Sequence, residues 1–227
     1  MIEIHAYDGI PKSEITKLRT TSSGKKYSLN HPKELIVPMR YTPRQNTKNS
    51  QGWERDQKHY WSSILEHHPQ CLSTRNQKRI RDNQSPKVDK TFIESFPQHK
   101  EFNRSVLYHH HIGGNGDAVA LPVDIHKGYG EIHNIENNLG VTKNAERFTE
   151  QCHKVCAKDQ KYYGQTSREF QNRIHQENNR EKTAINSKTG KPSSAASAKT
   201  LLDKKQGDQK PSKESQTRQN KSIDRSH

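Results

Sequence analysis

Five of the fourteen histidines in the chain fall within one stretch of 25 residues, between positions 109 and 133. They are His109, His110, His111, His126 and His133. A neutral imidazole can act as a general base near physiological pH and can also bind a borderline metal ion. Hydrolysis of a phosphodiester needs a base to activate water and a cation to stabilise charge on the phosphate. The histidine-rich stretch therefore predicts a metal-dependent nuclease site.

Two short strands and one helix are expected to position these side chains. Residues 106–111 and 118–123 are β-prone runs, and the glycine-rich segment 113–117 between them is a strong turn signal. Residues 131–139 have a helical pattern that Gly140 would end as a C-cap. The sequence thus predicts an α+β fold with a small ββα metal-binding core at about 105–140, added helices and disordered basic extensions.

The histidine triplet leaves its own roles open. Strand alternation places His109 and His111 on one face and His110 on the other, but a twist at the strand end leaves all three available. An alternative is a non-enzymatic nucleic-acid-binding module in which the histidines hold a structural zinc. Such a site has four protein ligands and no open position, whereas a catalytic site leaves room for water.

Composition limits how much of the chain can fold into a core. Of its 227 residues, 27% are hydrophobic, well below the roughly 45–50% of ordinary globular chains. The formal charge of +14 favours polyanionic partners, of which nucleic acid is the first. No apolar run is long enough to span a bilayer, and no secretory signal is visible at the N-terminus.

The predicted organisation has four parts. Residues 1–50 are expected to be an irregular arm or connector, and residues 51–145 the domain that carries the site. Residues 146–180 are expected to be a charged helical extension, and residues 181–227 a disordered basic tail. In the second part, residues 51–81 have a helical pattern whose aromatic stripe is expected to be core.

Basic and cysteine residues outside the stretch supply further predictions. The residues expected to contact nucleic-acid phosphates are Arg75, Lys78, Arg79, Arg81 and Lys127. The three cysteines give no disulfide framework. Cys152 and Cys156 are expected to face solvent on a helix rather than to form a zinc clip with the neighbouring His153 and the distant His175.

The stretch from Leu107 to His111, followed by Ala120-Leu121-Pro122 with His126 four residues after the proline, resembles a known family. It is similar to the His-Me finger nucleases of the HNH/endonuclease VII superfamily. Within that superfamily it resembles the polymorphic-toxin branch with an HHH motif, which is related to the WHH and LHH toxin nucleases. The resemblance covers roughly residues 52–142, and the middle Asn of the HNH motif has no clear counterpart unless Asn115 serves.

The resemblance implies a role for each histidine. His109 would be the first metal-binding residue, His110 the general base and His126 a metal ligand from the finger helix, while His133 would be a further ligand or a phosphate contact. His111 is the alternative base if the register differs by one residue, and Asp117 and Glu136 are additional candidates.

The resemblance also implies a cofactor, partners and a location. The cofactor would be a divalent metal ion, Mg²⁺ first, with Zn²⁺ or Ni²⁺ as alternatives. The substrate would be DNA, or RNA, and a cognate immunity protein would be a partner, with no membrane involved. The protein would be made in the bacterial cytoplasm and delivered to a target cell as a secreted effector.

Overall fold

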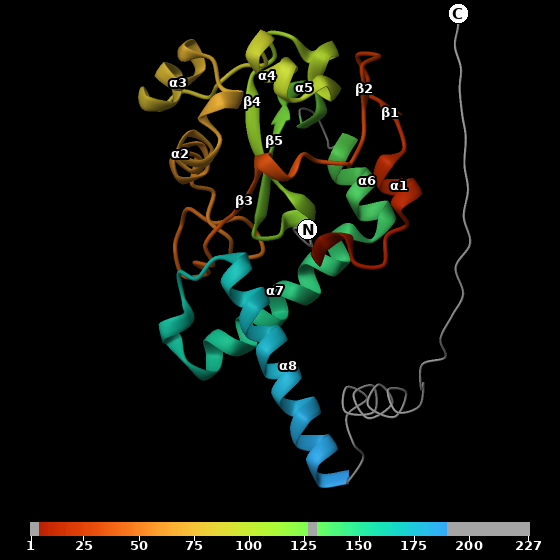
Figure 1. Cartoon of the computed structure of the whole chain (residues 1–227), viewed down its shortest axis with the longest axis vertical. Helices are drawn as coiled ribbons and strands as arrows, with labels where there is room; N and C mark the ends of the chain where they lie inside the picture. The colour runs from red at the N-terminus through yellow and green to blue at the C-terminus, as the bar shows by residue number, and fades with distance from the viewer. Residues whose placement is uncertain (1–4, 127–130, 190–227) are drawn as a thin grey trace, which may run out of the picture. The chain divides into compact units, whose positions relative to one another are not determined.

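The computed structural model describes residues 5–126 and 131–189, which form a mixed α+β structure (Figure 1). The strands are β1 Arg19–Thr20, β2 Lys26–Tyr27, β3 Ile36–Pro38, β4 Leu107–His111 and β5 Asp117–Pro122. The helices are α1 Lys12–Thr16, α2 Gln57–His67, α3 Thr74–Arg81, α4 Lys90–Ser95, α5 Val123–His126, α6 Glu131–Leu139, α7 Val141–Lys158 and α8 Ser167–Thr189. The α+β prediction is confirmed.

A three-stranded antiparallel sheet with the order β3-β5-β4 forms the centre of the fold. Strand β5 lies in the middle, and all six of its residues are buried. It pairs with β4 from Leu107 opposite Pro122 to His111 opposite Ala118. The turn between these strands contains Gly113 with φ +59, where a Cβ would lie 2.9 Å from the Val141 carbonyl oxygen. Only glycine fits this turn without strain, because it tolerates positive φ and lacks the clashing atom.

Helix α2 packs on one face of this sheet. Asp56 caps its N-terminus by accepting a hydrogen bond from the His59 backbone N–H. The Tyr60 hydroxyl donates to the Leu35 carbonyl at 2.6 Å, so the helix is tied to the residue that precedes β3. The expected helical stretch 51–81 is therefore divided into α2 and α3, and Trp53 lies outside both helices.

Helix α6 packs against the opposite face of the sheet, and Gly140 joins it to α7. Gly140 adopts φ 82, the left-handed conformation expected of a C-cap glycine. The predicted helix over 131–139 is thus confirmed as Glu131–Leu139. Strand, turn, strand and helix follow each other in the predicted ββα order.

A second, smaller core lies where α7 and the start of α8 meet the segment 41–53. Its buried residues are Tyr41, Trp53, Phe148, Cys152, Cys156 and Phe170. The Trp53 and Phe148 rings stack with their centroids 6.1 Å apart. The expectation that Cys152 and Cys156 face solvent was wrong, because the apolar side of α7 carries both into this aromatic cluster as free, buried thiols. Burial raises the pKa of Cys156 to about 11.

Residues 5–50, expected as an irregular arm, supply β3 to the central sheet and several core side chains, among them Leu29, Leu35 and Met39. The chain divides into two compact units, Met1–His175 and Gln176–His227. In the second unit, α8 continues to Thr189, so the first part of the predicted tail is helical. The rest of that tail lies outside the described residues. No helix within 5–126 and 131–189 has the length and apolar character needed to cross a membrane.

Candidate metal centre

Three histidines from three elements converge beside the sheet. His110 comes from β4, His126 is the last residue of α5, and His133 is the third residue of α6. The ring centroids are 5.3 Å apart for His110 and His126, 4.8 Å for His110 and His133, and 5.2 Å for His126 and His133. Each ring offers a nitrogen, and these nitrogens all lie within 4.8 Å of one another. We call this group the histidine cluster.

Glu136 lies behind the histidine cluster. Its side chain and that of His110 are both fully buried, and Glu136 Oε1 lies 2.9 Å from His110 Nε2. The second carboxylate oxygen lies 3.8 Å from His133 Nδ1, and the His133 side chain is 49% exposed. A carboxylate that binds the far nitrogen of an imidazole fixes the ring and its tautomer, as in the outer shell of metal sites.

Burial sets the protonation of the cluster. Burial and, to a smaller extent, the neighbouring His110 and His133 together lower the pKa of His126 to about 4. Burial also lowers the pKa of His110 and raises the pKa of Glu136, so the charged form of each group is disfavoured. The imidazoles of His110 and His126 are therefore neutral at physiological pH, which is the form that binds a metal ion.

The other two members of the triplet face the α2 side of the sheet. The His109 ring stacks on Tyr60 at 5.5 Å and lies 5.7 Å from the His111 ring. His111 Nδ1 lies 2.7 Å from the Asn115 carbonyl oxygen, to which it donates a hydrogen bond. Burial lowers the pKa of each histidine to about 4. The structure thus brings His110, and not His109, together with His126 and His133.

Two residues near the cluster gave weak signals or none in the sequence. Glu136 was only an additional candidate, although its position three residues after His133 on one helix places the two side chains together. Tyr108 was not predicted as a site residue, yet it is 42% exposed and its ring lies 6.1 Å from that of His126. An exposed aromatic in a strand has no sequence signal until its neighbours are known.

The predicted phosphate contacts on α3 have mixed surroundings. Lys78 and Arg81 are exposed, and Lys78 forms an ion pair with Asp82 at 3.0 Å. Arg79 is half-buried and its Nε donates to the Ser85 carbonyl at 2.8 Å. Arg75 is exposed beside it. Lys127, the fifth predicted contact, lies outside the described residues.

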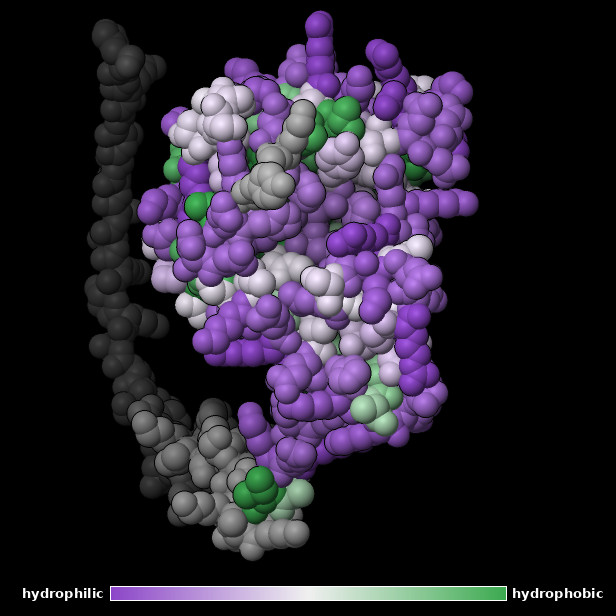
Figure 2. Space-filling view, turned by 180° about the vertical axis from the view of Figure 1, so that it is seen from behind, coloured by the Kyte–Doolittle hydropathy of each residue, from purple (hydrophilic) through white to green (hydrophobic). Residues whose placement is uncertain are grey.

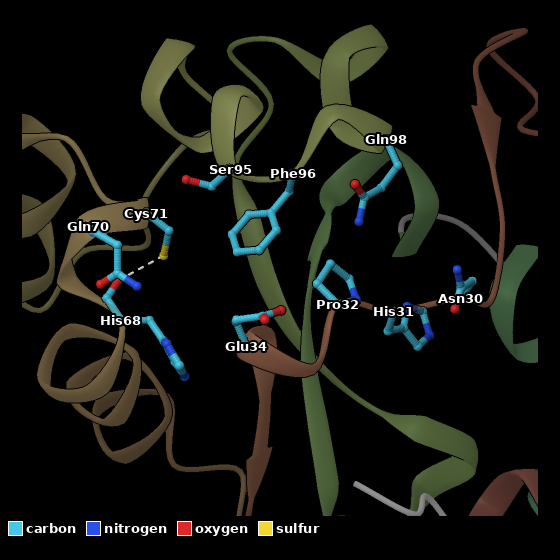
Figure 3. A pocket seen from close by; sticks show the side chains of 10 residues that line it. All are labelled: Asn30, His31, Pro32, Glu34, His68, Gln70, Cys71, Ser95, Phe96 and Gln98. Carbon is cyan, nitrogen blue, oxygen red and sulfur yellow. Dashed lines mark hydrogen bonds between the residues drawn. The ribbon is translucent and has the colours of Figure 1, made fainter. Parts of the chain in front are cut away.

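A cavity of about 350 Å³ lies apart from the histidine cluster. Figure 3 shows Glu34, Phe96 and Gln98 pointing toward its middle, with His31 and His68 at its sides. It is lined by none of the three cluster histidines. The geometry therefore places the candidate chemistry at the cluster and not in this cavity.

Comparison with protein-family models matches residues 33–134 to one family, described as HNH/Endo VII superfamily nuclease toxin with a HHH motif. The matched segment begins just before β3 and extends into α6, so it includes the whole sheet and the three cluster histidines. The same comparisons find no match among curated proteins or among solved structures.

Proposed function

Residues 33–134 match the model of the HNH/Endo VII superfamily nuclease toxins with a HHH motif, and from this premise we propose that the chain is a metal-dependent endonuclease. A nuclease toxin acts on nucleic acid, and the charge of +14 suits such a substrate. The observation that carries the proposal is the convergence of His110, His126 and His133 to within 4.8 Å.

The donor set fits a divalent ion. Nδ1 of His110 is buried and has no hydrogen-bond partner among the described residues, while Nε2 is held by Glu136. An ion at the cluster would satisfy that nitrogen. Three imidazoles with an open position are the pattern of catalytic zinc sites, whereas structural sites use four protein ligands. The histidine cluster thus favours the enzyme over the structural-zinc binding module.

We assign His110, His126 and His133 to hold the ion, which moves His110 from the base that the sequence predicts to a ligand. A bound divalent cation would stabilise negative charge on the phosphate and lower the pKa of a water molecule. Glu136 would keep the His110 ring in place. The buried imidazoles can bind the ion because they are neutral.

We assign the general base to His111, the alternative that the sequence left open. His111 faces the α2 side of the sheet but ends β4 directly after the ligand His110, so this role requires the substrate to bind at the strand end, within reach of both side chains. Its Nδ1–H is committed to the Asn115 carbonyl, so Nε2 is the nitrogen that carries the lone pair. This hydrogen bond fixes the tautomer that accepts a proton. In structures without substrate, the distances of catalytic groups are often longer than in the reacting complex.

The matched family and the net positive charge of the chain support a proposal for the substrate and the biological setting. DNA is the proposed substrate, cut with little sequence preference, because cationic contacts to phosphate carry no base information. The protein would act as the secreted effector of a polymorphic toxin system, with a cognate immunity protein that protects the producing cell. Zn²⁺ or Ni²⁺ is the proposed ion, because three imidazole ligands suit them, whereas Mg²⁺, the ion expected first from the sequence, prefers oxygen ligands.

The test combines plasmid cleavage with direct metal binding. Plasmid DNA is incubated with the wild-type protein and Mg²⁺, Mn²⁺, Zn²⁺ or Ni²⁺, with and without EDTA. Titration calorimetry with Zn²⁺ reports ion binding independently of cleavage. His110→Ala should lose both ion binding and cleavage. His111→Ala should bind Zn²⁺ like the wild type but cut on the order of 10²–10⁴-fold more slowly.

The matched control is His67→Ala, an exposed histidine at the C-terminal end of α2, which should behave like the wild type in both assays. Failure of the wild type to cut plasmid DNA or RNA with any of the four ions would refute the proposed activity. Equal loss of Zn²⁺ binding in His111→Ala and His110→Ala would refute the separate roles.

A further inference from the structure

A basic cavity of about 410 Å³ lies outside the histidine cluster. Three segments form it: α3, the residues that lead into α4, and the loop before β4, which lie together at one end of the sheet (Figure 1). Five cationic side chains line it: Arg75, Arg79, Lys87, Lys90 and Arg104. We call it the basic cavity.

The single carboxylate that lines the basic cavity is already bonded within the protein. Asp89 Oδ1 accepts a hydrogen bond from the Phe92 backbone N–H at 3.0 Å. Its Oδ2 accepts from the Ser73 hydroxyl at 2.5 Å and from Asn76 Nδ2 at 2.8 Å. Asp89 is therefore a capping residue that joins α3 to α4, and the cations of the cavity face an anion that is largely engaged.

The framework of the basic cavity is held in place by partly buried hydrogen bonds. Asn76 donates to the Lys87 carbonyl and accepts from the Lys87 backbone N–H. Arg79 Nε donates to the Ser85 carbonyl, which fixes the plane of its guanidinium. Arg104 adopts φ 72, rare for a residue other than glycine, while its backbone N–H donates to the Val88 carbonyl at 2.7 Å. Strained backbone of this kind persists where the surroundings determine it and is frequent at ligand sites.

We propose that the basic cavity binds backbone phosphates of the nucleic acid on which the histidine cluster acts. This inference rests on the proposed function. Five cations from three segments attract a polyanion, and arginine forks match phosphate oxygens in a bidentate geometry. Contacts of this kind position a substrate without reading its sequence.

The chain itself links the basic cavity to the histidine cluster. Arg104 precedes His110 by six residues, and an extended chain covers at most about 3.3–3.6 Å per residue, so the two Cα atoms lie within roughly 20 Å. In duplex DNA that upper limit corresponds to about six base steps at 3.4 Å each. The cavity is therefore near enough to bind a phosphate of the same duplex within about half a helical turn of the cluster.

The surface seen in Figure 2 agrees with a polar ligand. Hydrophilic side chains dominate that face, and apolar side chains occur there only in small separate patches. Among the described residues, the exposed large hydrophobic side chains are Leu18, Tyr108 and Ile185, which belong to three different elements or loops. Charge is therefore the property by which this unit would recognise a large partner.

The experiment measures equilibrium binding of a fluorescent 30-base-pair DNA by anisotropy, in EDTA, at several salt concentrations between 50 and 200 mM. The test variant is Arg75→Gln with Lys90→Gln, both exposed; Lys90 forms an ion pair with Glu94 at 3.8 Å. Loss of two phosphate contacts should reduce the slope of log K against log salt by about 2, and the affinity at 100 mM salt at least about tenfold.

The matched control is Lys154→Gln with Lys158→Gln on α7, which removes the same charge and also breaks one exposed Lys–Glu pair. This control should change the slope of log K against log salt by less than half as much as the Arg75→Gln and Lys90→Gln variant does. A second test variant, Lys87→Gln with Arg104→Gln, should reproduce the effect of the first from other segments of the cavity. Thermal unfolding of each variant verifies that it is folded.

If both test variants and the control have equal DNA affinity and an equal slope of log K against log salt, the proposal is overturned. An acidic protein would then be the partner to test for the cavity. The outcome is separable from the proposed function, because binding in EDTA requires no cleavage. A wild type that cuts DNA while the cavity variants bind like the control would refute only this inference. A wild type that binds through the cavity but cuts nothing would refute only the nuclease.

Discussion

Replacing Glu136 with glutamine tests the histidine cluster most directly. Glu136 is fully buried, and its Oε1 lies 2.9 Å from His110 Nε2. Glutamine has nearly the same volume and can still hydrogen-bond to the imidazole, so the substitution leaves no cavity. What it removes is a carboxyl group that can lose its proton when a cation binds, and that would then balance the cation and make His110 a stronger ligand.

Loss of such an outer carboxylate typically weakens metal binding about 10–100-fold, which corresponds to about 1.4–2.7 kcal/mol of binding free energy. The dissociation constant for Zn²⁺, measured by titration calorimetry, should rise by that factor. The protein without metal should keep its melting temperature, because packing is preserved. His126→Ala, which removes a ligand itself, should lose more affinity than Glu136→Gln.

The control is Glu146→Gln, at an exposed position on α7. It makes the same change from a carboxyl to an amide without touching the cluster, and its Zn²⁺ affinity should equal that of the wild type. A Zn²⁺ dissociation constant for Glu136→Gln within twofold of the wild type would refute the idea that Glu136 supports a ligand. A large fall in melting temperature without metal would show instead that the carboxylate is needed for folding.

Three further predictions concern other parts of the fold. The Oδ1 atom of Asp117 accepts a hydrogen bond from the Ser167 hydroxyl at 2.6 Å, and burial raises the pKa of this carboxyl in the folded protein. The protonated carboxyl therefore stabilises the fold at low pH, and this stability is lost as the pH rises through the raised pKa. Asp117→Asn should therefore have the higher urea midpoint at pH 7, and the difference should vanish below the unfolded pKa; an advantage independent of pH would contradict this. Gly116→Ala should lower the free energy of unfolding in urea by about 1–3 kcal/mol, because its Cβ would overlap with Trp53 Cε3; no loss would mean that the ring can move freely. Tyr108→Ala should raise the KM for DNA by an amount equivalent to about 1–3 kcal/mol of lost stacking, with Zn²⁺ affinity unchanged and Tyr108→Phe like the wild type; an unchanged KM would exclude a stacking role.

Local patterns were sufficient for the ββα unit. The β-prone run before His109, the glycines of the turn and the left-handed Gly140 each determine backbone conformation through neighbouring residues alone, and the structure has β4, β5 and α6 where these signals place them. The same reasoning failed for Cys152 and Cys156. Helical spacing identifies a shared face, but it does not say whether another element covers that face, and here Trp53 and Phe170 do so.

The third strand of the sheet, β3, pairs with a strand that is far away in the chain, and no local signal in the sequence indicates this pairing. Strand β3 has only three residues, among prolines and polar side chains, and pairs with β5 through Ile36 opposite Val119. Short strands of this kind are stabilised by their partner, and their own propensity is weak. The irregular composition of the first fifty residues therefore concealed a structural strand.

The sequence by itself determined that the histidines would gather on one ββα unit and that the chain would favour polyanions, because turn glycines, strand propensity and net charge are properties of the residues alone. Only the tertiary structure decided which member of the triplet joins His126 and His133. Consecutive strand residues point to opposite faces, and the two faces are equivalent until helices pack on them. Because α6 covers the face of His110 and α2 the face of His109, packing selects His110 for the cluster and leaves His109 against Tyr60.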